Sequence, residues 1–326
     1  MLESPTTHTP SPWIAIHGCK RSRRLPGWFA GVRSRIARWA LIVGVGLLPS
    51  CRPAEPAPAT ATNDYRRVVT MSPSTAEIIF ALGAGDRLVG VSRFCTYPPE
   101  AQQLPTIGGQ RDPDLERIVS LHPDLLILRG SNDVVEKLCH ELGAQVYHDP
   151  TNTLDDLFIT IGELGRMLQH RRQAQTLIDS MRQSLNDVRE RVRKYDPVRV
   201  LFVVSRSPDR LANVYAVGGG SYLATLIEIA GGIGVFNDSQ MDYLEVSPEA
   251  IASVQPEVII EAIPGRALDS AEKATLAAHW DKLGDIPAVR NDRVIIVTDS
   301  YVTIPSPRIT ILAEDMAGWL HGRDER

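Results

Sequence analysis

The chain has few of the residues and motifs that carry covalent or metal chemistry. Only four of its 326 residues are cysteines, and their spacing matches no metal-binding motif. No G-x-S-x-G elbow, no H-E-x-x-H helix and no G-x-x-x-x-G-K-[ST] loop occurs in it. The nearest glycine-rich run is "VGGGSY", where Ser221 suits the N-cap of a following helix better than a nucleophile. We therefore expect a protein that is not an enzyme.

Aromatic residues make up only 6% of the chain, and outside its N-terminal arm basic residues are fewer than acidic ones. Seven of the 35 lysines and arginines lie in residues 1–51, against one of the 39 acids, so the remainder of the chain is acidic. It carries no basic cluster of the kind that a phosphate backbone requires. We expect no nucleic-acid partner.

The chain has no hydrophobic run long enough to span a membrane. A shorter apolar run near its N-terminus predicts export. "WALIVGVGLLPSC" follows Arg33, Arg35 and Arg38 and is too short to span a bilayer as a mature helix. Its end, Leu48 to Cys51, resembles the lipobox of bacterial lipoproteins, in which the cysteine is lipidated; an ordinary cleaved signal is the alternative. We assign residues 1–51 to a signal segment and 52–65 to a disordered Pro/Ala/Thr-rich tether. The expected location is the periplasm or cell surface, with a lipid anchor at Cys51.

The loss of the signal segment leaves two cysteines in the body, Cys95 and Cys139. An oxidising compartment permits a disulfide between them, but spacing alone does not establish one. Both the bridged and the free state stay open at this point.

Strand and helix patterns alternate from residue 67 onward. The first alternation reads strand 67–71, helix 74–83, strand 88–92, helix 114–121, strand 124–128, helix 132–142 and strand 145–148. Ser72 is expected to cap the first helix, with Pro73 in its first turn, and Gly83 and Gly85 to end it. Short connections between strands and helices predict an α/β layer with a parallel sheet.

A helical tract from 154 to about 193 follows, with a break near 169–172, and then the alternation resumes. The second part reads strand 199–204, a loop and helix through "VYAVGGGSYLATLIEIAGG", helix "SPEAIASVQ", strand "EVIIEA", helix 271–282, strand 293–298 and a last helix from about 307. Both parts contain a helix-Pro-acid-strand pattern, at Pro123 and Pro256. We predict two Rossmann-like α/β lobes, 66–168 and 197–326, joined by one long backbone helix within 169–196.

Several stretches together carry a family likeness. "RVVTMSPSTAEIIFALGAGDRLVGVSRFCTYPPEAQQLPTIGG", "DLERIVSLHPDLLIL", "GGGSYLATLIEIAGGIGVFND", "VSPEAIASVQPEVII" and "SPRI" resemble, in this order, the periplasmic binding proteins for cobalamin, ferric siderophores and haem that feed ABC importers. The resemblance covers roughly residues 66 to 320. It implies two lobes on a rigid helix, a ligand held in the cleft between them, and a permease as partner.

The resemblance implies capture of cobalamin or a related corrinoid, with a ferric siderophore or haem as the alternative. A tethered interaction or sensor module with the same fold is an alternative of another class. We expect a monomer that binds without covalent chemistry, has no cofactor of its own and contains no metal site. His122, His140 and His148 suggest a metal receptor only if they converge, and His122 precedes a proline while His140 lies on a surface helix.

Two glutamates match the acids with which family members dock permease arginines. Glu77 in "STAE" and Glu249 in "SPEA" stand one in each lobe, where charge pairs suit a transient interface. The alternative is that both are first-turn helix glutamates that complement the helix dipole.

Six residues are the candidates for ligand binding. Tyr97 and Tyr243 match pocket aromatic positions of cobalamin-binding members, and aromatic faces suit a planar macrocycle. At two positions where such members often present tryptophans, this chain has a glutamine and an arginine, and both arginine candidates follow strands and suit carboxylates or an anionic iron chelate. The full set is Tyr97, Gln110, Arg129, Arg206, Tyr243 and Tyr301. Arg308 is expected to open the last helix and to pair locally.

Overall fold

The computed structural model describes residues 64–322. The predicted signal segment 1–51, its Cys51 and residues 52–63 of the tether lie outside the described residues, and these assignments stay predictions. The last two tether residues are ordered: Arg87 Nη1 donates to Asp64 Oδ1 at 2.6 Å and to the Tyr65 backbone oxygen at 2.5 Å. No helix in the described range is long and apolar enough to cross a membrane.

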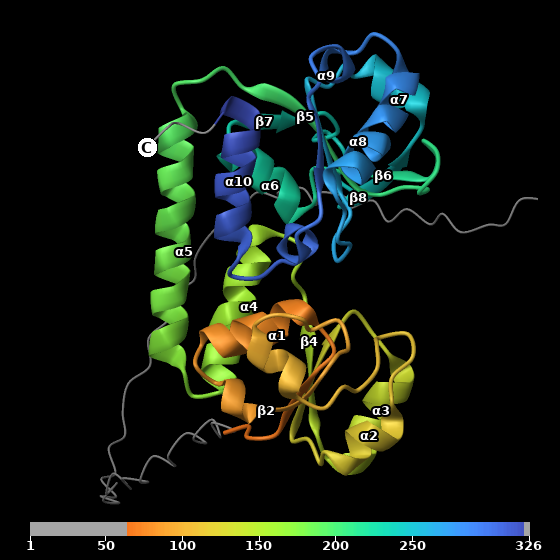
Figure 1. Cartoon of the computed structure of the whole chain (residues 1–326). Helices are drawn as coiled ribbons and strands as arrows, with labels where there is room; N and C mark the ends of the chain where they lie inside the picture. Colours follow the sequence, from red (N-terminus) through yellow and green to blue (C-terminus); the bar gives the residue numbers. More distant parts are fainter. Residues whose placement is uncertain (1–63, 323–326) are drawn as a thin grey trace, which may run out of the picture. The chain divides into compact units, whose positions relative to one another are not determined.

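The first lobe is built on a four-stranded parallel sheet in the order β2-β1-β3-β4, seen at the bottom of Figure 1. Three of its strands, β1, β2 and β3, are almost wholly buried and apolar, as parallel strands covered by helices require, whereas the edge strand β4 is partly exposed and more polar. Its elements are β1 (Val68–Thr70), α1 (Pro73–Ala81), β2 (Leu88–Val91), α2 (Leu115–Ser120), β3 (Leu125–Arg129), α3 (Asp133–Leu142) and β4 (Gln145–Asp149), with 3-10 turns η1 (Gly85–Arg87) and η2 (Pro99–Gln103).

The start of α1 differs from the expectation in its hydrogen bonds. Pro73 occupies the first turn as predicted, but the Ser72 side chain does not cap the helix. Its hydroxyl instead lies 2.9 Å from that of Ser74, which donates to Asp149 at the end of β4 (3.3 Å). Gly83 has the predicted positive φ (+75°), whereas Gly85 does not and is packed against the Phe80 ring.

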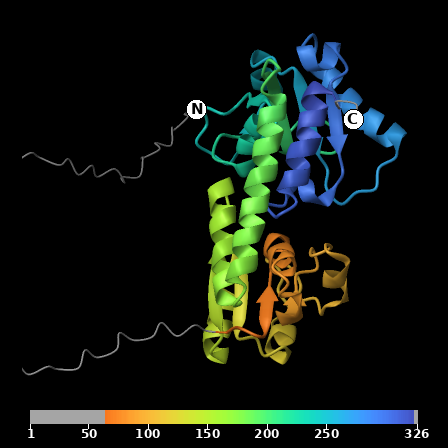
Figure 2. The same ribbon diagram turned by 90° about the vertical axis from the view of Figure 1, so that its left-hand side faces the viewer.

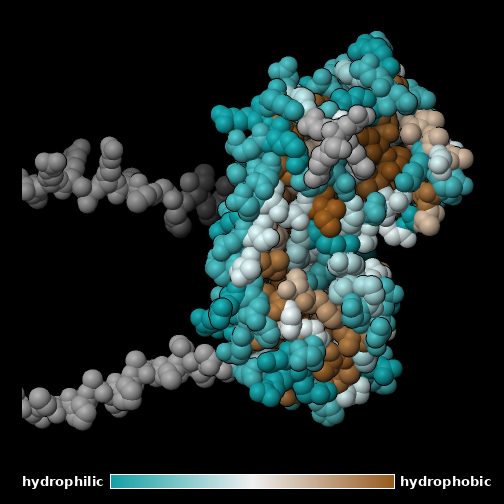
Figure 3. All heavy atoms as spheres, turned by 60° about the vertical axis from the view of Figure 1, so that its left-hand side comes forward, coloured by the Kyte–Doolittle hydropathy of each residue, from teal (hydrophilic) through white to brown (hydrophobic). Residues whose placement is uncertain are grey.

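Two helices connect the lobes. They are α4 (Leu154–Met167) and α5 (Arg171–Val192), with the break where the sequence predicted it, and α5 falls within the expected segment 169–196. One stripe of α5 is buried at spacings of three and four residues: Ala174, Ile178, Met181, Leu185, Val188 and Val192. In Figures 1 and 2, α5 runs alongside elements of both lobes. The opposite face of this helix is exposed and carries mostly polar and charged residues. Figure 3 shows the surface from this side, with hydrophilic residues along its left flank.

The second lobe has a six-stranded mixed sheet in the order β10-β9-β5-β6-β8, with β7 beside the start of β5. Strands β10, β9 and β5 are parallel, while β5-β6 and β6-β8 are antiparallel. The elements are β5 (Val198–Ser205), β6 (Val214–Val217), α6 (Tyr222–Ile229), β7 (Gly232–Gly234), β8 (Tyr243–Val246), α7 (Pro248–Ser253), β9 (Val258–Ala262), α8 (Ser270–Ala278), η3 (His279–Leu283), α9 (Pro287–Arg290), β10 (Val294–Val297), η4 (Ser300–Thr303) and α10 (Ile309–His321).

The predicted two-lobed α/β fold is thus confirmed, but the antiparallel side of the second sheet was missed. We had read Val214–Val217 as loop, whereas it forms strand β6. Strand β6 has only four residues, too few to show a two-residue period clearly, and its partner β8 does not alternate between buried apolar and exposed polar residues.

The helix-Pro-acid-strand pattern forms the same structure in both lobes. His122 and Gln255, just before the prolines, have positive φ angles of 44° and 45°. The acid that follows each proline accepts from backbone N–H groups at the start of the central strand: Asp124 from Arg66 and Arg67, and Glu257 from Arg199. The guanidiniums of Arg67 and Arg199 in turn donate to carbonyls at the carboxyl ends of α2 and α7, the helices that end just before the two prolines. We call this arrangement the strand-start fastener.

The two body cysteines are free and buried, and they belong to different core clusters. Burial raises the pKa of the Cys95 thiol to about 12 and that of Cys139 to about 11. Of the two states left open by the sequence, the structure therefore shows the free one.

Candidate functional site

Most of the predicted ligand-binding residues lie at or beyond the carboxyl ends of the parallel strands. Ligands of open α/β sheets bind beyond these ends. At the end of β3, the Gln110 side-chain amide donates to the backbone oxygen of Arg129. Asn132 Nδ2 donates to the Gln110 backbone oxygen at 2.8 Å, which fixes the loop. The structure therefore brings Gln110 and Arg129 together.

Arg129 is weakly held. Within residues 64–322, the one polar contact that we find for its guanidinium is a 3.4 Å approach of Nη2 to the Asn152 side-chain oxygen. A guanidinium has five N–H donors, so most of the hydrogen-bonding capacity of Arg129 remains for another partner. Its position at the end of a strand makes it a ready anion contact.

The second lobe meets this region at the start of α6. The Tyr222 backbone N–H donates to the Asn152 backbone oxygen at 2.8 Å. Ser221 caps α6 as predicted, with the Leu223 N–H donating to its hydroxyl, and lies 3.5 Å from the Tyr243 hydroxyl. Tyr243 thus faces the same junction between the lobes as Arg129.

Tyr222 itself is buried there, and its hydroxyl has no hydrogen-bond partner among the described residues. Burial raises the pKa of Tyr222 well above its ordinary value, Tyr243 adds to the rise, and the charge of Arg129 opposes it. A buried hydroxyl without a partner is rare in proteins, and this one lies where the two lobes meet.

A second group of residues joins the lobes through Arg308, at the start of α10. Its Nε donates to Glu77 Oε2 at 2.8 Å, and its Nη2 donates to the other carboxylate oxygen. The two side chains are 13% and 3% exposed. The expectation that Arg308 pairs locally is wrong, since Glu77 lies 231 positions away in the other lobe.

Two of the predicted ligand tyrosines belong to this second group. The Arg308 guanidinium lies 4.1 Å from the Tyr97 ring centroid and 5.5 Å from that of Tyr301. Such cation–π contacts contribute about 0.5–2 kcal/mol each, depending on how dry they are. Tyr301 donates from its hydroxyl to Asp315 Oδ2 at 2.6 Å, and burial together with this carboxylate raises the pKa of Tyr301. We call Glu77, Tyr97, Tyr301 and Arg308 the Arg308 cluster.

A pocket of about 480 Å³ opens beside the Arg308 cluster. It is lined from both lobes, with apolar side chains around two glutamates and the arginine. The lining residues are Glu77, Phe80, Ala81, Tyr97, Pro98, Glu100, Pro307, Arg308 and Ile311. Volume and composition suit part of a large organic ligand.

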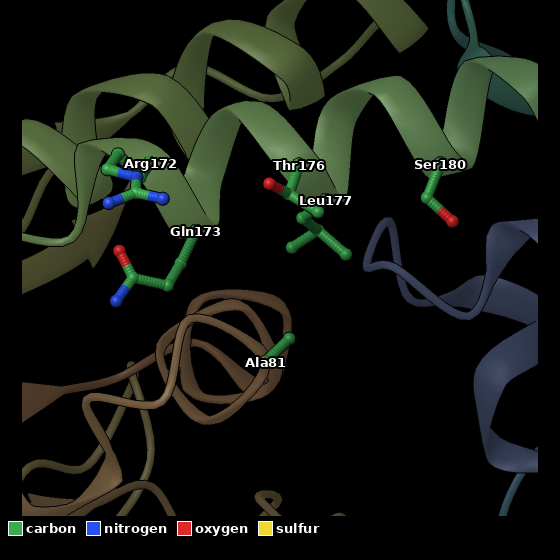
Figure 4. A pocket seen from close by; sticks show the side chains of 6 residues that line it. All are labelled: Ala81, Arg172, Gln173, Thr176, Leu177 and Ser180. Carbon is green, nitrogen blue, oxygen red and sulfur yellow. The ribbon is translucent and has the colours of Figure 1, made fainter.

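A larger groove of about 680 Å³ lies between α5 and the end of α1 (Figure 4). Figure 4 shows Arg172, Gln173, Thr176 and Ser180 of α5 around it, with Ala81 of α1 opposite. Its lining is mainly polar and contains no aromatic residue, so it lacks the faces that the first pocket offers.

Arg206 follows β5 as predicted, but its side chain is engaged inside its own lobe. Its Nε lies 2.8 Å from Glu261 Oε1, and the two side chains are 2% and 3% exposed. Glu261 Oε2 also accepts from Trp280 Nε1 at 2.8 Å, and the guanidinium lies 5.7 Å from the Trp280 ring. A ligand-binding role for Arg206 stays a prediction, and it would require this buried pair to open.

The two predicted docking acids differ sharply in exposure. Glu249 is exposed in the first turn of α7, and hydrogen bonds from its own backbone N–H and from Ser247 lower its pKa. Glu77 is buried against Arg308, so its docking role stays a prediction that requires Arg308 to release it.

The sequence analysis missed one aromatic at a strand end. Phe94 follows β2 by three positions and is 58% exposed, beside the ion pair of Arg93 and Asp112. The scarcity of aromatics and the strand-end rule together would have singled it out.

The three histidines with metal-binding potential do not converge. No group of three or more His, Cys, Asp or Glu side chains within residues 64–322 is arranged to hold a metal ion. His122 Nδ1 lies 2.9 Å from the Ser120 oxygen, and His148 Nδ1 lies 3.0 Å from that of Gly130.

Comparison with known proteins agrees with this geometry. The family model described as "Periplasmic binding protein" matches residues 68–301. A vitamin B12-binding protein of Vibrio cholerae is 28% identical over 273 residues, which cover 82% of this chain and 91% of that protein.

Solved structures give two further likenesses. The periplasmic vitamin B12 binding protein of Vibrio cholerae superposes with a TM-score of 0.65 at 27% identity, covering 79% of this chain and 97% of that one. A periplasmic haem-binding protein of Roseiflexus gives 0.64 at 26% identity, covering 78% and 98%.

Proposed function

Because the chain belongs to the periplasmic binding protein family, we propose that it captures a corrinoid between its lobes and delivers it to the permease of an ABC importer. The matched relatives are binding proteins, and this chain is likewise a periplasmic binding protein of the vitamin B12, haem and siderophore type rather than an enzyme. The corrinoid, the permease, the monomeric state and the lipid anchor at Cys51 are our proposals.

The observation that carries the proposal is the meeting of the end of β3 in the first lobe with the starts of α6 and β8 in the second, around Arg129, Tyr222 and Tyr243. Similarity to vitamin B12-binding proteins over most of the chain favours a corrinoid as the occupant. The aromatic faces of Tyr97 and Phe94, at the ends of the same lobe's strands, suit a flat macrocycle.

A second candidate, an anionic iron chelate or haem, is favoured by Arg129. Its guanidinium is largely free, and a carboxylate of the ligand would satisfy it bidentately. Tyr222 would then contribute its unmatched hydroxyl to the same group.

Calorimetric titration of the full chain with cyanocobalamin, cobinamide, haem and a panel of ferric siderophores tests these candidates. We expect binding of the corrinoids, with affinity for cobinamide little changed by Arg129→Gln, because cobinamide offers neither a carboxylate nor a phosphate. A preference for haem or siderophores that Arg129→Gln weakens by about tenfold, the effect of one lost charged hydrogen bond, would favour the second candidate instead. Absence of binding across the panel would contradict transport and support the tethered interaction module.

Charge reversal at Glu249 tests permease docking. Glu249→Arg should abolish uptake of the bound ligand by cells while affinity for it stays unchanged, because an exposed acid at a transient interface acts on docking. Glu190→Arg is the control, since Glu190 is an exposed acid on α5 that pairs with Arg193 of the same segment and matches neither predicted docking position. Uptake that survives in the Glu249 variant would remove this residue from the docking surface.

A further inference from the structure

The Arg308 cluster contains the ion pair of Arg308 and Glu77. It is the one side-chain ion pair that we find between α1 of the first lobe and the start of α10 of the second in the described part of the chain. Both carboxylate oxygens of Glu77 are used by one guanidinium, in the bidentate geometry that is the strongest for this pair. Because Glu77 is 3% exposed, the carboxylate has little access to water that could replace Arg308.

The guanidinium also makes cation–π contacts with two tyrosines. Tyr97 covers it from the first lobe and Tyr301 approaches it from the second. Tyr301 is anchored to α10 through Asp315, whereas Tyr97 is 44% exposed and stands on a loop. Arg308 is thus the contact that restrains the orientation of the Tyr97 ring.

We propose that Arg308 is a positioning residue: it clamps the two lobes through Glu77 and, by stacking, holds Tyr97 in the orientation in which it meets the ligand. The effect on the ligand rests on the proposed function, whereas the clamp between the lobes does not. Separation of α1 from α10 would leave a buried carboxylate unpaired, so the clamp favours one spacing of the lobes with or without ligand.

Hydrogen exchange of the ligand-free full chain tests the clamp directly. Arg308→Gln should speed exchange in residues 94–104 of the first lobe by about tenfold, because the loop that carries Tyr97 loses its partner. Glu77→Gln should have the same effect, and the double variant should add little to either single one, since the two residues act as a pair. A merely local role for Arg308 would change exchange only in the second lobe.

Arg191→Gln is the matched control. Arg191 of α5 pairs with Glu314 of α10, the helix that Arg308 begins. This pair is largely exposed and does not involve α1 of the first lobe. Its loss should leave residues 94–104 unchanged. Arg308→Lys should restore only part of the protection, because an ammonium keeps the charge but has neither the bidentate fork nor a flat face.

Titration with the tightest binder of the ligand panel tests the positioning of Tyr97. Arg308→Gln should weaken binding by about tenfold, and in the Tyr97→Ala background the same change should have less effect, because the two residues act as a unit. Unchanged affinity in Arg308→Gln would overturn the positioning role, and unchanged exchange in residues 94–104 would overturn the clamp. If the wild-type chain binds nothing in the panel, the proposed function fails, while exchange still decides the clamp.

Discussion

Replacement of Arg206 with leucine should destabilise the protein by about 3–5 kcal/mol, one of the two largest effects that we expect. The side chains of Arg206 and Glu261 are 2% and 3% exposed, so the change leaves a carboxylate buried without its cation. Trp280 would still donate one hydrogen bond to it, which is too little to balance a charge. Chemical denaturation monitored by tryptophan fluorescence would measure the loss.

The double variant Arg206→Leu with Glu261→Gln separates the charge from the packing. Glutamine keeps an oxygen for the Trp280 N–H and carries no charge, so we expect most of the lost stability to return. Arg191→Leu is the control for an exposed pair and should cost about 0–1 kcal/mol. A loss below 1 kcal/mol in Arg206→Leu would show that water reaches Glu261, and Arg206 would again become a plausible ligand contact.

Leu185→Ala in the middle of α5 should cost about 2–5 kcal/mol, because it removes a side chain that is 4% exposed and leaves a cavity. Leu185 belongs to a core cluster that includes buried residues of both lobes, so the cavity opens where α5 supports both of them. We expect one cooperative unfolding transition, shifted to lower denaturant.

Leu185→Met is the control, since it keeps the volume and should cost less than about 1.5 kcal/mol. Leu177→Ala offers a comparison on a partly buried position that lines the groove of Figure 4, and a smaller loss is expected there. Equal losses in Leu185→Ala and Leu177→Ala would contradict the view that the buried stripe of α5 carries the connection.

The parts of the fold that follow from local pattern were predictable. Most of the parallel strands, such as β1, β3 and β10, are continuous apolar runs, and the stripe on α5 repeats at helical spacing, so both can be recognised from nearby residues. Strands β6 and β8 depend instead on pairing with each other and with β5, and their short sequences do not show it. The Ser72 side chain was misassigned because its hydroxyl pairs with that of Ser74, which in turn donates to Asp149, instead of accepting from the helix end.

The candidate site was predictable where a residue follows a strand, and unpredictable where it pairs across the lobes. Arg129 ends β3, and Gln110 lies on the loop after β2, so both were placed at the carboxyl ends of strands, where the Gln110 amide donates to the Arg129 backbone oxygen. Glu77 was predicted to be a docking acid, with a first-turn helix acid as the alternative, but it is the fifth residue of α1. No local signal shows that Arg308 would cover it from 231 positions away. Arg206 has the position of a ligand contact, but Glu261 and Trp280 decide where its side chain lies.

The strand-start fastener has a consequence for how this chain can change over evolution. In each lobe it ties the central strand, β1 or β5, to the end of α2 or α7 at the amino end of the sheet. The ligand is expected at the opposite end. Each lobe makes this tie from its own residues, so its integrity does not depend on the side chains at the other end. Substitutions that adapt the binding end to a new molecule can therefore accumulate there while both halves keep their shape.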